Sequence, residues 1–262
     1  MKVRFCFSAE QLKNIALVSM VIDHAAVGLI EQSELASGVA WSLCGTAMRL
    51  VGRVAFPLFA FMIAEGAAHT RDRRWYALRL LLLAVISEIP FDLVAGGTWL
   101  FPVDQNTVFT LLLGLLAIWA GDLICGTGSG VSYGNREKTG DGGRKAVGQR
   151  RFPLEYERYI RVLAAVPFGL AAYCLKTDYG FMGVLLIVIL YTLRTEPQLR
   201  TAVCAVFLFC MYMDFYGAAA CVAIFLINRY NGEKGGGSGR IFYLFYPLHL
   251  LVIRGIKMAV GL

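Results

Sequence analysis

The chain has 262 residues, of which 58% are hydrophobic and only 16% are charged, and its mean hydropathy is +0.62. This composition excludes an ordinary soluble domain and indicates a polytopic membrane protein. The net charge of +7 lies mainly in loops between apolar runs, which favours contact with the lipid bilayer over a nucleic-acid-binding surface.

Nine apolar runs follow one another along the chain, and each predicts a helix. In chain order they are 12–30, 39–64, 76–95, 107–124, 159–175, 181–193, 201–213, 215–228 and 241–260. Several reach the roughly 20 residues that cross a bilayer core, whereas the sixth and seventh are short enough to be tilted, broken or partly interfacial. The sequence therefore predicts an all-α membrane bundle of about nine transmembrane helices, within a range of 8–10, that forms one domain over residues 1–262.

Basic residues gather in alternate loops, and this pattern predicts the orientation. Lys and Arg cluster at the N-terminus and in segments 71–79, 136–161, 194–200 and 229–240. Because cytoplasmic loops are enriched in Lys and Arg, we expect the N-terminus in the cytoplasm, and an odd number of helices puts the C-terminus outside. The segment at about 126–155 is rich in Gly and basic residues, which predicts a flexible cytoplasmic loop.

Six ionisable side chains lie inside or beside the first three runs, where a charge at the helix centre costs about 2.5–3.5 kcal/mol. They are Asp23, His24, Arg49, Arg53, Glu88 and Asp92. The second run is directed inward and the third outward. The two arginines and the two acids are therefore expected at the same depth in the membrane as His24, which predicts one network of mutually neutralising charges. A purely structural cluster is the alternative, but an imidazole at this depth exchanges protons near neutral pH, which favours a function.

Lys13 and His24 are eleven residues apart, which places them on one face of the first helix, about 16 Å apart along its axis. Alone, Lys13 is typical of a snorkelling anchor at a helix end, and His24 of a polar residue in helix packing. Their common face, with Asp23 beside His24, favours a functional role for the pair.

The sequence contains no motif that predicts a metal site or a phosphate loop. Its seven cysteines include no C-x-x-C pair and are expected to be small hydrophobes. The Gly-rich stretch at 126–151 lacks the G-K-[ST] element of a phosphate loop.

Ordered polar motifs resemble the TraX family over nearly the whole chain except the 126–155 loop. The matching segments are 12–24, 49–61, 64–71, 87–92, 106–111, 178–180 and 245–249. The family includes the F-pilin acetylase of conjugative plasmids. The spacing of Lys13 and His24 is also similar to the R/K-x10-H signature of the wider membrane acyltransferase-3 superfamily, which moves acetyl groups from cytoplasmic acetyl-CoA to acceptors across the membrane.

The resemblance implies an acetyl-CoA-dependent acyltransferase of the bacterial cytoplasmic membrane. His24 matches the catalytic position and would deprotonate the acceptor or accept the acetyl group transiently. Asp23, or the pair Glu88 and Asp92, would hold its orientation. The acceptor, an amine or hydroxyl on a protein N-terminus or a glycan, is not identified by the sequence.

The same resemblance gives roles to the remaining charges. Arg49 and Arg53 would pair with the acids or steady the developing oxyanion. Residues expected to bind the anionic donor are Lys13, Glu65, His69, Arg71, Arg73, Arg74, Arg79 and His249. Of these, His249 is expected nearer the cytoplasmic side, where it would bind the donor or gate its entry.

Two other classes of function stay open. Membrane-embedded ionisable residues also mark proton-coupled transporters, and a structural charge cluster fits a non-catalytic membrane assembly factor. Binding of acetyl-CoA separates both from an acetyltransferase. The sequence leaves open whether the protein is a monomer or a homodimer.

Overall fold

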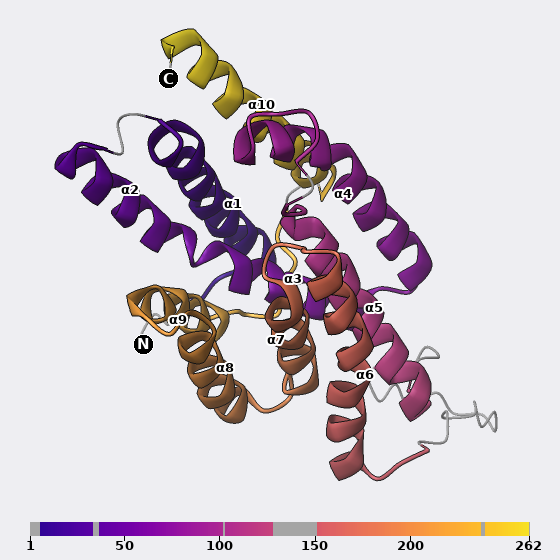
Figure 1. Cartoon of the computed structure of the whole chain (residues 1–262). Helices are drawn as coiled ribbons and strands as arrows, with labels where there is room; N and C mark the ends of the chain where they lie inside the picture. Colours follow the sequence, from indigo (N-terminus) through magenta and orange to yellow (C-terminus); the bar gives the residue numbers. More distant parts are fainter. Residues whose placement is uncertain (1–5, 34–36, 102, 128–150, 237–238, 262) are drawn as a thin grey trace.

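The computed structural model describes residues 6–33, 37–101, 103–127, 151–236 and 239–261, and these are mostly helical (Figure 1). The elements are α1 Ala9–Ala25, the π-helical turn η1 Ala26–Glu31, α2 Val39–Gly52, α3 Ala55–His69, α4 Arg73–Ala95, α5 Thr107–Cys125, α6 Leu154–Cys174, α7 Gly180–Thr192, α8 Pro197–Tyr212, α9 Phe215–Ile227 and α10 Gly239–Val260. The predicted all-α fold is confirmed. Most of the predicted 126–155 loop, residues 128–150, lies outside the described residues.

Several helices have the length and composition of membrane spans. Four described segments are long and apolar enough to cross a membrane: Ala9–Glu31, Val39–His69, Thr107–Cys125 and Tyr243–Val260. Three shorter apolar helices, α7, α8 and α9, accompany them. This is the pattern of a multi-pass membrane protein. With α2 and α3 counted as one segment, the described residues contain nine helical segments, in the order of the nine predicted runs; how many cross the bilayer stays a prediction.

The second apolar run, 39–64, is not the single helix that its hydropathy predicts. α2 ends at Gly52 and α3 begins at Ala55. Pro57 has no N–H to donate, and its ring collides with the carbonyl of Arg53 four residues earlier, so the helix opens there. α3 therefore departs from the direction of α2 and enters the middle of the molecule (Figure 1).

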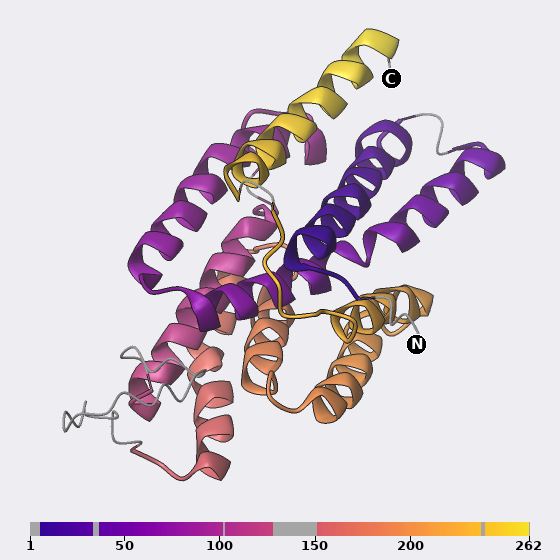
Figure 2. The ribbon, with the colours of Figure 1, turned by 180° about the vertical axis from the view of Figure 1, so that it is seen from behind.

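α3 is the central helix of the bundle. It contacts α1, α5, α7 and α9, and its side chains Phe56, Leu58 and Phe61 are buried. α4 and α10 pack together on one side, and α8 and α9 form a hairpin on another (Figures 1 and 2). Large apolar side chains such as Leu82 on α4 and Leu251 on α10 are exposed, as expected of surfaces that contact lipid.

Backbone hydrogen bonds tie the chain before α1 to the segment that joins α9 and α10. The amide of Phe7 donates to the carbonyl of Arg229 at 2.8 Å, and the amide of Ala9 donates to that of Glu233, also at 2.8 Å. This pairing holds the connecting segment against the beginning of α1. It thereby brings Lys234 to the same end of the molecule as the first turns of α1.

Candidate active site

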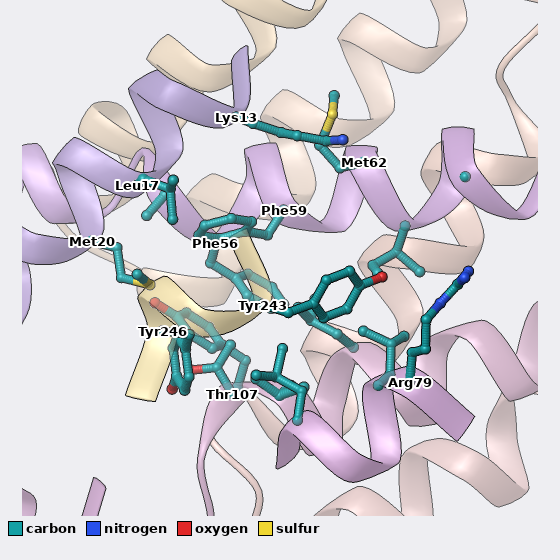
Figure 3. Close-up of a pocket in the computed structure, with 18 of the residues that line it drawn as sticks. Lys13, Leu17, Met20, Phe56, Phe59, Met62, Arg79, Thr107, Tyr243 and Tyr246 are labelled. Carbon is teal, nitrogen blue, oxygen red and sulfur yellow. The ribbon is translucent and has the colours of Figure 1, made fainter. Parts of the chain in front are cut away.

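A cavity of about 840 Å³ runs between α1, α3, α4, α5 and α10 (Figure 3). The side chains at one end are basic: Lys13, His69, Arg79 and Lys234. Those at the other end include two acids and a histidine: Asp23, His24, Thr107 and Asp178. Aromatic and apolar side chains make up much of the remaining lining: Leu17, Met20, Phe56, Phe59, Met62 and Tyr243. One continuous space therefore joins Lys13 to His24, the two residues whose spacing predicts a shared face.

His24 lies against His249 rather than against an acid. Nδ1 of His24 is 2.7 Å from Nε2 of His249, and the two rings are nearly parallel and meet edge to edge, with their centroids 5.0 Å apart and an interplanar angle of 11°. Nδ1 of His249 lies 3.1 Å from the carbonyl oxygen of Phe245, one turn earlier in α10. The ring of Tyr246 meets His24 edge-on, with 6.2 Å between centroids.

His249 therefore lies level with His24 along the helices, not closer to the N-terminal end of α1 as its predicted depth implied. α10 contacts both α1 and η1, so its middle, where His249 lies, meets the last turns of α1. His249 lines a second cavity of about 340 Å³, whose other lining residues are apolar and come from α1, η1 and α10. It is not among the residues that line the large cavity.

Asp23 is engaged by Arg49 and so does not orient His24. Its Oδ2 accepts from Nη1 of Arg49 at 2.5 Å, and Nε of Arg49 lies 3.3 Å from Glu31. Adjacent residues on a helix point about 100° apart, which directs Asp23 toward α2 while His24 faces α10. Gly52 permits this approach, because a Cβ there would overlap the Asp23 carboxylate.

The acids expected to neutralise the arginines are used elsewhere. Glu88 accepts hydrogen bonds from the backbone amide of Asn106, at 3.2 Å, and from its side chain, and Asp92 accepts from the amide of Phe101 at 3.0 Å. Both fasten the connection between α4 and α5. In the part of the chain that the structure describes, α2 packs on α1 and η1 whereas α4 packs on α5 and α10, so the expected network of Arg49, Arg53, Glu88 and Asp92 is not formed.

Asp178 is the second acid near the arginines. It is half-buried, and its Oδ2 accepts from Thr107 at 2.6 Å, while Arg53 and Arg49 act on it electrostatically. The Arg53 guanidinium itself lies over the rings of Tyr212 and Tyr216, 5.4 and 5.2 Å from their centroids. Asp178 belongs to the sequence motif 178–180, but the sequence predicted no role for it. It lies in the loop before α7.

The residues predicted to bind the donor divide into two groups. Lys13, His69 and Arg79 line the basic end of the large cavity, whereas Arg71 and Arg74 are exposed and are not among its lining residues. Glu65 lies 3.6 Å from His69 without lining the cavity. Lys234, which sequence reasoning missed, joins the basic end through the backbone pairing described above.

Arg73 belongs to a separate buried cluster around Asp122. Its Nη2 lies 2.8 Å from Oδ2 of Asp122, and Nε of Arg161 lies 3.0 Å from the other oxygen. The hydroxyl of Tyr191 donates to Oδ2 at 2.6 Å. These contacts join α4, α5, α6 and α7, so Arg73 is turned away from the predicted donor site.

Comparison with known proteins identifies the family. The family model described as TraX protein matches residues 8–128 and 150–257. Over 276 residues the chain is 26% identical to the probable fimbrial assembly protein FimC, serogroup H1, of Dichelobacter nodosus, with 96% of each chain covered. No solved structure matches the chain. Because the two matched segments make up most of the sequence, the chain belongs to the TraX family.

Proposed function

We propose that this protein is an integral-membrane acetyltransferase, which transfers the acetyl group of cytoplasmic acetyl-CoA to an amine or hydroxyl at the outer side of the membrane. The observation that carries the proposal is the single cavity that joins a basic end, with Lys13 and Lys234, to His24. Membership of the TraX family supports the reaction class. The relative's description as a fimbrial assembly protein favours an acceptor on the subunit of a surface fibre, such as its N-terminal amine.

The chemistry of the cavity suits this donor. Acetyl-CoA carries several phosphate charges, which Lys13, Lys234 and Arg79 attract as cations. The narrow pantetheine arm would extend along the aromatic and apolar lining of the cavity, past Phe59 and Tyr243 (Figure 3). Lys13 and His24 are about 16 Å apart along α1. A donor whose phosphates are held at the basic end would therefore extend its thioester toward the histidine.

His24 then acts on the acceptor. Its imidazole removes the proton from the attacking amine or hydroxyl while the acceptor atom forms a bond to the acetyl carbonyl carbon. The carbon–sulfur bond breaks, and the imidazolium returns the proton to the departing CoA thiolate. Arg49 and Arg53 offset the charges of Asp23 and Asp178, which makes the burial of these acids beside the site tolerable.

Isothermal titration of purified protein in detergent with acetyl-CoA tests the donor site. The wild-type protein is expected to bind, and Lys13→Ala and Lys234→Ala each to bind more weakly, because each variant removes a cation that meets phosphate. Arg74→Ala is the matched control. Like the other two variants it removes one cation, but Arg74, near the beginning of α4, is exposed and is not among the lining residues of the cavity. Absence of binding by the wild-type protein would contradict the acetyltransferase and favour a transporter or an assembly factor.

A further inference from the structure

We propose that His249 is a positioning residue, which holds His24 in the tautomer that leaves its Nε2 lone pair free for reaction. The inference rests on the proposed function, in which His24 is the reactive residue. It assigns to His249 a role in orientation instead of the donor binding that its sequence position predicts.

The tautomers follow from the order of the hydrogen bonds. A carbonyl oxygen can only accept, so Nδ1 of His249, 3.1 Å from the oxygen of Phe245, carries a hydrogen. In a neutral imidazole the other nitrogen is then an acceptor, which makes Nε2 of His249 the acceptor of the 2.7 Å contact. Nδ1 of His24 must donate to it. Nε2 of His24 is therefore left unprotonated, as a base or nucleophile requires.

The packing fixes this arrangement. His249 is buried, and its ring lies nearly parallel to those of His24 and Phe245, with centroids 5.0 and 5.5 Å away and interplanar angles of 11° in both cases. The 340 Å³ cavity on which it borders is otherwise apolar, so within the described residues that side offers His249 no competing polar group.

The neighbouring acids contact other groups instead of His24. Asp23 is paired with Arg49 at 2.5 Å, and Asp178 accepts from Thr107 at 2.6 Å. When Nε2 of His24 gains a proton, the hydrogen bond from its Nδ1 to His249 becomes charge-assisted and strengthens. His249 thus corresponds in role to the third group of a catalytic triad, which orients the base and stabilises its charged form.

Two variants of His249 separate positioning from packing. In His249→Gln the amide oxygen can still accept from His24, so acetyl transfer to acceptors in native membranes is expected to be retained in part. In His249→Phe no acceptor faces His24, and kcat is expected to fall by about 100-fold or more with KM for acetyl-CoA unchanged. Leu251→Ala, an exposed position on α10, is the control and is expected to behave as wild type.

Nitrogen NMR of protein with 15N-labelled imidazoles reads the tautomer without any need for activity. The chain has three histidines, and the His69→Gln and His249→Gln variants assign their signals. A protonated Nδ1 and an unprotonated Nε2 on His24 support the inference, and the reverse tautomer overturns it, as does full activity of His249→Phe. If the expected tautomer is found but the wild-type protein transfers no acetyl group, the proposed function fails while the pairing of the two histidines stands.

Discussion

Gly52 and Asp23 are in such close contact that no side chain fits between them. A Cβ at Gly52 would overlap the carboxylate that pairs with Arg49. Gly52→Ala is therefore expected to displace Asp23 and to lower the free energy of unfolding by about 1–3 kcal/mol, measured by thermal unfolding in detergent.

Gly255 in α10 supplies the matched control for this substitution. A Cβ there meets no heavy atom of the described residues within 4 Å, so Gly255→Ala is expected to be neutral or to stabilise by up to about 1 kcal/mol through helix propensity. If both variants unfold at the wild-type temperature, the close approach of Gly52 to Asp23 is wrong.

At the scale of single residues, the sequence was sufficient to predict that Lys13 and His24 face the same space, but not to predict the position of His249. Lys13 and His24 are on one helix, so the helical repeat alone predicts that they face the same space, and both do line one cavity. The contact between His24 and His249 joins residues 225 positions apart. Which helices lie side by side, and how each is rotated, cannot be obtained from the periodicity of a single run.

Among the helices, α4 shows that the depth of a residue in the membrane does not determine which residues it contacts. The alternation of inward and outward runs predicted the depth of Glu88 and Asp92, but it did not predict which helices lie beside α4. α4 packs on α5 and α10, so these acids meet the amides of Asn106 and Phe101 instead of arginines. The break between α2 and α3 was visible in the sequence as Pro57, although hydropathy alone gives one continuous run.

The buried cluster around Asp122 joins four helices, and its removal tests how much it stabilises the bundle. Asp122→Ala leaves Arg73 and Arg161 without the carboxylate that lies within 3.0 Å of each. The free energy of unfolding is expected to fall by about 3–5 kcal/mol. Asp104→Ala removes an exposed carboxylate and should change it by no more than about 0.5 kcal/mol. Equal stability of the two variants would show that the cluster contributes nothing.

For the whole molecule, the expected orientation in the membrane decides which end of the cavity the donor can enter. Single cysteines introduced at Gln32 and Arg151, in a background without the native cysteines, are expected to react with membrane-impermeant reagent from opposite sides. Arg151 should react from the cytoplasm and Gln32 from outside, because basic loops stay inside. Labelling of both positions from one side would contradict the orientation and the entry of donor at Lys13.

Transfer of labelled acetyl groups across the membrane tests the proposed function most directly. Inside-out vesicles from the native host, given acetyl-CoA labelled in the acetyl group, are expected to accumulate label on a membrane or lumenal acceptor, whereas sealed right-side-out vesicles are not. His24→Ala should abolish the transfer and still bind acetyl-CoA, because a general base acts in the transition state and contributes little to donor affinity. Undiminished transfer by a folded His24→Ala protein, or no transfer by the wild-type protein, would contradict the proposal.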